Sequence, residues 1–280
     1  MSFERFLYLA YTVLYGVAFV FYLLYFLSPK KVKAIIPRSI LLFAFGVHTL
    51  FIIVRWYDAG HAPLQTLYEA ISWFAWSAII AYIIVEWRRH VYLAGVIVLP
   101  VVLGSLIFAY TKLPYTTKPL PPALQSYWFE IHVMGAFASY AYFVIAFAVE
   151  VVYLILRPIV KGGGGTRYDL DLKKLERFHV MAYNLILFGF PFLTFGIFSG
   201  AAWAEDAWGG YWAWDPKETW SLITWLIFAG YLHAKVTPKL GRGFASFLNI
   251  LGFVAMIFTF LGVNWLAKIL GIPSLHTYAF

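Results

Sequence analysis

Apolar residues occur along this chain in long runs that are separated by short polar segments. Each run holds about 20 residues, the length that an α-helix needs to cross the hydrocarbon core of a bilayer. A helix also satisfies its own backbone hydrogen bonds there, where water is absent. Eight such stretches are predicted, at 6–27, 38–56, 67–87, 91–110, 127–156, 179–199, 217–236 and 244–263. The pattern predicts an all-α polytopic membrane protein with about eight transmembrane helices, forming a single transmembrane domain over residues 1–280.

Composition supports this prediction and excludes several other classes of protein. Charged residues make up 12% of the 280 positions and apolar residues 62%, with a mean hydropathy of +0.78. A soluble globular domain carries about 25% charged residues. The chain has no cysteine, which excludes disulfides, thiolate metal sites, Fe–S clusters and cysteine nucleophiles together.

Basic residues gather on one side of the predicted membrane topology. If the chain crosses at every apolar stretch, fifteen of the 21 basic residues fall on one side and six on the other. The six are Arg5, Arg55, Lys112, Lys118, Lys217 and Lys268. Because cytoplasmic loops are enriched in Lys and Arg, both termini are expected on the outer side. The net charge of +8 is then a topology signal, and nucleic acid is not an expected partner.

Two long loops have distinct patterns. The outer loop 111–126 contains four prolines, so an irregular, extended segment is expected. The loop 157–178 on the cytoplasmic side begins with four glycines at 162–165, a flexible hinge. After them Leu172, Leu175 and Phe178 recur at helical spacing among basic residues. This spacing predicts a short amphipathic helix lying on the anionic inner leaflet.

Half of the twelve tryptophans fall in residues 203–225. They are Trp203, Trp208, Trp212, Trp214, Trp220 and Trp225. Interfacial Trp and Tyr belts are common in membrane proteins, but a belt spreads over many helix ends, whereas these residues are concentrated around one loop. Gly209 and Gly210 permit close approach of the backbone. Large flat side chains with small residues between them suit a large, flat, apolar ligand at the membrane surface, such as a ring-shaped cofactor.

The charged residues of this segment have structural explanations as well as functional ones. Asp215, Pro216 and Glu218 have the spacing of an N-cap, N1 and N3, so the two carboxylates are expected to form a capping box that opens the seventh helix. Lys217 has no such role. Its ammonium is expected either to lie in solvent or to pair with an anionic group of the ligand.

Four of the seven histidines have no clear ligand role. His90 and His179 lie near basic residues on the cytoplasmic side and are expected to be ordinary surface groups. His61, in the first outer loop, is ambiguous. His48 lies in the middle of the second stretch, where a lone histidine is more often hydrogen-bonded to a neighbouring helix than a ligand, although intramembrane ionisable residues are functional candidates.

The remaining three histidines are candidate ligands of a haem iron. His132 lies just inside the outer end of the fifth stretch, and His276 lies in the C-terminal tail on the same side. Two imidazoles over an aromatic platform can ligate one haem iron from opposite faces. His233 lies 13 residues after Trp220, about 20 Å along a helix, so it is expected within the membrane towards the cytoplasm.

The stretch from Trp208 to His233, WGGYWAWDPKETWSLITWLIFAGYLH, resembles the tryptophan-rich WWD signature of haem-handling proteins, and residues 203–225 are called the WWD segment below. Its WDPKETW core and trailing YLH are most similar to the CcsA/ResC family of cytochrome c biogenesis proteins. Further segments match this family: APLQTLYEAISW at 62–73, WFEIHVMGAFASYAYF around His132, and the C-terminal GIPSLHTYAF. The resemblance covers nearly all of the chain.

The resemblance implies a function in cytochrome c maturation. Such proteins deliver haem b to the outer face with a CcsB/ResB partner and attach it, as a holocytochrome c synthase, to the CXXCH motif of apocytochrome c. The expected location is a bacterial inner membrane or a thylakoid membrane, with the active face outside the cytoplasm. Since this chain has no cysteine, a separate thioredoxin-like reductant is expected to keep the substrate thiols reduced.

The resemblance also assigns site residues. His132 and His276 match the two external haem ligands, and His233 matches a transmembrane ligand whose counterpart lies on the partner subunit. The expected haem-binding residues of the WWD segment are Trp208, Gly209, Gly210, Tyr211, Trp212, Trp214, Asp215, Lys217 and Trp220. Three alternatives remain: a haem exporter or chaperone without ligase activity, an electron-transfer membrane cytochrome, and a transporter with an aromatic belt.

Overall fold

The computed structural model describes residues 2–116 and 120–271. Within these ranges the chain is helical and contains no strand. The α-helices are α1 (Phe3–Leu27), α2 (Ile35–Ala59), α3 (Leu67–Arg89), α4 (Gly95–Lys112), α5 (Tyr127–Lys161), α6 (Leu172–Trp208), α7 (Pro216–Val236), α8 (Gly241–Ile257) and α9 (Val263–Leu270). A π-helical turn, Phe258–Gly262, joins α8 to α9. The prediction of an all-α fold is confirmed.

Among the described residues, seven helical segments are long and apolar enough to cross a membrane, by length and composition. Six of them correspond to the first six predicted stretches, and the seventh, Gly241–Leu266, contains the last. The remaining predicted stretch forms α7, which has 21 residues and includes polar positions such as Thr224 and His233. The chain is therefore an integral membrane protein, and α7 packs between α6 and α8.

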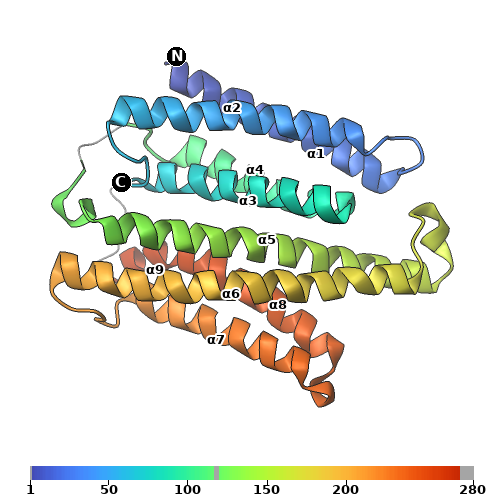
Figure 1. Ribbon diagram of the computed structural model, residues 1–280. Helices are drawn as coiled ribbons and strands as arrows, with labels where there is room; N and C mark the ends of the chain where they lie inside the picture. Colours follow the sequence, from blue (N-terminus) through green and yellow to red (C-terminus); the bar gives the residue numbers. More distant parts are fainter. Residues whose placement is uncertain (1, 117–119, 272–280) are drawn as a thin grey trace.

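Successive helices from α1 to α8 run antiparallel, and the long pair α5 and α6 forms the centre of the bundle (Figure 1). Helices α1 to α4 lie on one side of this pair, and α7 to α9 lie on the other. Helices α5 and α6 make the most extensive contact of any two elements. Glycines allow the close approach, since a Cβ at Gly196 would lie 3.3 Å from the backbone nitrogen of Ala136.

One end of the bundle carries the start of α1, the α2–α3 loop, the α6–α7 loop and the end of α9 (Figure 1). His132 and the WWD segment belong to this end, whereas the last turn of α7 lies at the opposite end. The helix order thus separates the predicted outer residues from the predicted inner histidine. That the first end faces away from the cytoplasm stays a prediction from the distribution of basic residues.

Buried ion pairs connect α1, α2 and α3 near both ends of the bundle. Arg55 is 2% exposed and lies 2.9 Å from Glu69 and 3.1 Å from Glu4. At the other end Arg38 bonds Glu86 at 2.8 Å, and the same carboxylate accepts the hydroxyl of Tyr22. Because each buried carboxylate has a cationic partner, the cost of removing these charges from water is offset.

The segment 157–178 differs from its prediction. Helix α5 continues to Lys161, and α6 already begins at Leu172, so the predicted amphipathic helix is the first part of α6. Leu175 is fully buried and Phe178 is 9% exposed. Their spacing is typical of one buried helix face as well as of a membrane-surface helix, and here that face packs into the bundle.

Candidate ligand site between α5, α6 and α7

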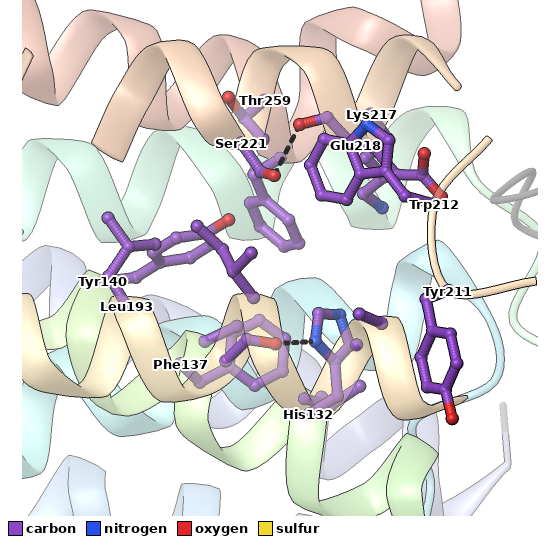
Figure 2. Close-up of a pocket in the computed structure, with 17 residues that line it drawn as sticks. His132, Phe137, Tyr140, Leu193, Tyr211, Trp212, Lys217, Glu218, Ser221 and Thr259 are labelled. Carbon is purple, nitrogen blue, oxygen red and sulfur yellow. Dashed lines mark hydrogen bonds between the residues drawn. The ribbon is translucent and has the colours of Figure 1, made fainter. Parts of the chain in front are cut away.

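A cavity of about 90 Å³ lies between α5, α6, α7 and the α6–α7 loop. In Figure 2, His132 lies on one side of this cavity, and Lys217, Glu218 and Trp212 lie on the opposite side. Its volume is below the roughly 300–1,000 Å³ of sites that enclose a whole small molecule. The cavity as it stands therefore suits the edge of a large ligand, with the rest of the ligand outside.

The walls of the cavity differ in polarity. Apolar side chains of α5 and α6, including Val133, Phe137 and Leu193, form the inner part. Polar groups of α7 and the π-helical turn, Ser221 and Thr259, lie across from them (Figure 2). An apolar body with a few polar groups at one side is typical of sites for flat organic ligands.

The imidazole of His132 is held by the backbone of α6. Its Nδ1 lies 2.7 Å from the carbonyl oxygen of Gly196, a bond drawn in Figure 2. Because a carbonyl oxygen can only accept, Nδ1 must carry the proton and donate it. The lone pair that can ligate a metal is then on Nε2. The predicted ligand His132 is thus placed at the cavity in a metal-ligating tautomer.

The ring of His132 also lies between Gly200 and Trp203. A Cβ at Gly200 would lie 2.6 Å from Nδ1, so the ring occupies the space that a side chain would need. The His132 and Trp203 rings stack with centroids 6.0 Å apart and planes inclined by 21°. Trp203 is itself fixed, since its Nε1 donates a hydrogen bond of 2.7 Å to the Ala123 carbonyl.

The α6–α7 loop is anchored at both ends by helix caps. Gly209 ends α6 in the left-handed conformation, with a φ of 75°. Glycine adopts this conformation without strain. Asp215 caps α7, and Glu218 completes a capping box because its carboxylate accepts a hydrogen bond from the Asp215 backbone nitrogen. The prediction of a capping box at these two carboxylates is confirmed.

Trp214 takes an unusual backbone conformation between these anchors. Its φ is 57°, in the left-handed region that large side chains rarely adopt. The side chain is 68% exposed and meets Trp212 edge-on, with ring centroids 5.7 Å apart. A strained residue that presents an exposed aromatic ring beside a cavity is a candidate for ligand contact.

The predicted residues of the WWD segment divide into two groups. Tyr211, Trp212 and Lys217 line the cavity together with His132. The others lie outside its lining, namely Trp208, Gly209, Gly210, Trp214, Asp215 and Trp220. His276 lies outside the described residues, so its predicted place beside His132 stays a prediction.

Two tryptophans of the second group have structural roles in packing. Trp208 packs on Trp203 with ring centroids 4.8 Å apart, and Trp220 packs on Phe258 at 4.3 Å. The carbonyl of Trp220 accepts the Thr259 hydroxyl at 3.1 Å. These contacts hold the rim of the cavity to α6 and to the π-helical turn.

His233 lies far from this cavity. It is exposed, in the last turn of α7, 16 residues after Lys217, which corresponds to about 24 Å along a helix. The predicted role of His233 as a transmembrane haem ligand stays a prediction.

His179 contradicts its prediction as a surface group. The side chain is 3% exposed, and its Nδ1 lies 2.9 and 3.0 Å from the two carboxylate oxygens of Glu150 on α5. Ser246 on α8 donates to the same carboxylate at 2.5 Å. The ring turns inward because it shares the buried face of α6 with Leu175, while the basic residues near it in sequence occupy other faces.

The other histidines agree with structural roles. His48 is fully buried, and its two ring nitrogens lie 3.1 Å from the Tyr15 hydroxyl and 2.9 Å from the Ser72 hydroxyl. His90 is exposed at the C-cap of α3, as predicted. His61 Nδ1 lies 3.0 Å from the Ala62 carbonyl. Because both nitrogens of His48 are hydrogen-bonded, it is poorly placed to ligate a metal.

Several residues at the site were not predicted from the sequence. Gly196 and Gly200 contact His132, while Ser221, Thr259 and Phe260 line the cavity. The pair Gly196 and Gly200 has the GxxxG spacing that permits close helix packing in membranes, and this pattern could have indicated the α5–α6 contact. No local pattern marks Thr259 or Phe260, since the π-helical turn brings them to the cavity.

A larger apolar cavity of about 440 Å³ lies on the other side of α5, between this helix and α3. Val133 and Phe137 line both cavities, so α5 forms the wall between them. The lining of the larger cavity contains no histidine among the described residues. The smaller cavity, with His132, is therefore the better candidate for the predicted chemistry.

Comparisons with known proteins identify the family of this chain. A family profile described as "Cytochrome C assembly protein" matches residues 64–271. The cytochrome c biogenesis protein CcsA of Guillardia theta is 37% identical over 252 residues, covering 82% of this chain and 81% of that protein. CcsA of Chlamydomonas reinhardtii is 38% identical over 251 residues, covering 88% of this chain and 69% of that protein. CcsA of Gloeothece citriformis is 35% identical over 271 residues, covering 80% and 81%.

A solved structure has the same fold. The chain named cytochrome c haem lyase CcmF superposes with a TM-score of 0.67 at 19% identity, covering 96% of this chain. The present chain spans about half of CcmF, 48% of its length. With the profile over residues 64–271 and the CcsA relatives above 30% identity, the chain belongs to the cytochrome c assembly family.

Proposed function

We propose that this protein matures cytochrome c, by delivering haem b to the outer side of the membrane and attaching it to apocytochrome c. The observation that carries the proposal is the hydrogen bond from His132 Nδ1 to the Gly196 carbonyl, which leaves Nε2 as the nitrogen able to ligate iron, at a cavity next to the WWD segment. The names of the CcsA relatives and of the CcmF haem lyase support the same function.

The residues at the cavity suit the chemistry of haem. Imidazole is a common axial ligand of haem iron, and His276 is proposed as the second ligand. Apolar side chains such as Val133 and Phe137 suit the porphyrin body, and Lys217 at the rim suits a propionate. Tyr211 and Trp212 supply aromatic surface at the opening. The cavity volume of about 90 Å³ supports a pose in which one edge of the haem enters the cavity and the other edge stays accessible to the substrate.

The proposed reaction is an addition of thiols to the haem vinyl groups. Each cysteine of a CXXCH motif adds across one vinyl C=C bond, so that a C–S bond forms at one carbon and a hydrogen is added to the other. No net oxidation or reduction occurs in this step. The histidine of the motif then replaces one axial imidazole. Because this chain has no cysteine, the thiols come from the substrate, and a thioredoxin-like reductant keeps them reduced.

His233 is proposed to bind haem before it reaches the outer site. It lies at the opposite end of α7 and is exposed on the bundle surface. A membrane subunit of the CcsB/ResB type would supply the second ligand there. The proposed location is the bacterial inner membrane or the thylakoid membrane, with His132 on the side away from the cytoplasm.

Co-expression with the partner subunit and a CXXCH apocytochrome, in a host without its own maturation system, tests this function. The amount of covalent haem on the cytochrome is the readout. We expect the double variant His132→Gly, His276→Gly to lose the product, and imidazole in the medium to restore part of it in either single variant. Undiminished product in the double variant would overturn the ligand roles. Haem bound to the membrane protein without any thioether product would instead favour a haem exporter or chaperone.

A further inference from the structure

Three residues of α6 form a seat for the His132 ring. Gly196, Gly200 and Trp203 are spaced by four and three positions, so they lie on one face of the helix. The Gly196 carbonyl accepts the Nδ1 proton at 2.7 Å, Gly200 leaves room for the ring, and Trp203 stacks on it. We call these three residues the His132 seat.

The hydrogen bond in the seat determines which nitrogen can ligate iron. With the proton fixed on Nδ1 by a carbonyl, which cannot donate, the alternative tautomer would place two lone pairs against each other. A backbone carbonyl that accepts from a ligating imidazole also makes the imidazole a stronger ligand, as hydrogen bonds behind metal-bound histidines do. The Gly196 carbonyl thus acts on the iron through His132.

The absence of a side chain at Gly200 determines where the ring lies. A Cβ there would come within 2.6 Å of Nδ1 and 2.9 Å of Cε1. Since Trp203 lies on the ring and its indole is bonded to Ala123, the ring has little freedom to move. Even alanine at position 200 therefore displaces the imidazole and lengthens its bond to Gly196.

We propose that the His132 seat is a positioning device for the haem-attachment reaction, in which the Gly196 carbonyl selects the Nε2-ligating tautomer and Gly200 sets the ring position. This inference rests on the proposed role of His132 as a haem ligand. It assigns to Gly196, Gly200 and Trp203 an action through His132, without contact between these residues and the reacting atoms.

Chemical rescue tests the hydrogen bond to the Gly196 carbonyl, which side-chain substitution cannot remove. In the His132→Gly variant, imidazole and 4-methylimidazole can ligate iron and still donate an N–H to Gly196. 1-Methylimidazole ligates iron but has no N–H, and it has the same number of heavy atoms as 4-methylimidazole. We expect imidazole and 4-methylimidazole to restore covalent cytochrome c, and 1-methylimidazole to restore at least about tenfold less. The yield with each compound is normalised to the affinity of that compound for free haem in the same detergent.

The outcomes of the rescue separate the seat from the proposed function. Equal rescue by all three compounds would overturn the role of the Gly196 carbonyl and would leave His132 as a haem ligand. Full product in His132→Gly without any added compound would overturn the ligand role itself. An inactive His132→Gly variant that none of the three compounds restores would also count against the ligand role.

Gly200→Ala tests the position of the ring, with Gly46→Ala as its matched control. Both glycines lie within transmembrane helices, but a Cβ at Gly46 meets nothing within 4 Å. We expect Gly200→Ala to lower covalent product by about tenfold and to reduce the low-spin fraction of bound haem, while Gly46→Ala changes neither. If Gly200→Ala leaves both the spin state and the product at the level of Gly46→Ala, the seat does not position His132. Membrane content of each variant, measured on the same samples, corrects for loss of folded protein.

Discussion

Glu218 holds the backbone on both sides of Trp214. Its Oε2 accepts hydrogen bonds from the nitrogen of Ala213 at 2.8 Å and from the nitrogen of Asp215 at 3.2 Å. Trp214 lies between these two residues with a φ of 57°. One carboxylate therefore fixes the conformation that presents the exposed Trp214 ring, and the capping box of α7 also shapes the α6–α7 loop.

Replacing Glu218 tests this relationship. Glu218→Ala removes the acceptor of both backbone nitrogens, so we expect a loss of about 1–2 kcal/mol in stability, as for other lost caps. Glu218→Gln keeps a carbonyl oxygen in place and is expected to lose less than half of that. Thermal unfolding in detergent and the rate of proteolysis within residues 209–215 measure the two effects. A rate of proteolysis equal to wild type in Glu218→Ala would show that the carboxylate does not hold the loop.

Substitutions of Trp214 are expected to affect stability and haem binding differently. Glycine adopts a positive φ without penalty, whereas alanine pays about 1–2 kcal/mol for the left-handed region. Trp214→Gly should thus be more stable than Trp214→Ala by about 1 kcal/mol, while both lose haem because the aromatic ring is gone. Thermal unfolding and haem content of the purified complex are the two measurements. Equal stability of the two variants would argue against strain at this position.

The Glu150–His179 pair is expected to be a strong structural contact. Removing one partner leaves a buried charge or polar group uncompensated, which costs about 3–5 kcal/mol for buried ion pairs. His179→Ala should therefore lower the unfolding temperature sharply, whereas His90→Ala at an exposed position should not. The double variant Glu150→Leu, His179→Leu removes both polar partners and should be more stable than His179→Ala. A His179→Ala protein as stable as His90→Ala would contradict the buried pairing.

His48 is expected to contribute to stability and not to haem ligation. Both of its ring nitrogens are hydrogen-bonded within the bundle, to Tyr15 and Ser72. His48→Ala leaves these buried hydroxyls without a partner, at a cost of about 1–3 kcal/mol. The unfolding temperature should fall while the haem spectrum stays that of wild type. Restoration of activity in His48→Ala by imidazole would instead indicate a ligand role.

Sequence patterns predicted the fold well because lipid imposes one simple requirement. Long apolar runs can satisfy their backbone only as helices, so the eight predicted stretches all correspond to helical segments. The limits of these helices were less predictable. Helix α6 begins at Leu172, seven residues before the predicted stretch at 179, because Leu175 and Phe178 pack into the bundle beyond the apolar run.

The site was predictable where its contacts are local in sequence. Asp215 and Glu218 are three residues apart, so their capping box follows from spacing. His179 was misjudged because its partner Glu150 comes from another helix, 29 residues earlier. The seat of His132 is of the same kind, since Gly196 is 64 residues away and meets His132 only through the packing of α5 on α6.

The spin state of ferric haem in a His233→Gly background tests most directly whether His132 ligates iron at the outer site. Because the proposed route to the outer site passes His233, ferric haem is added to the purified His233→Gly complex. The outer site is then the remaining proposed site, so the electron paramagnetic resonance spectrum of this complex reports on it. We predict a low-spin bis-imidazole signal in this background, its loss or conversion to a high-spin signal on adding His132→Gly, and its return with imidazole. An unchanged low-spin signal after His132→Gly would contradict ligation by His132.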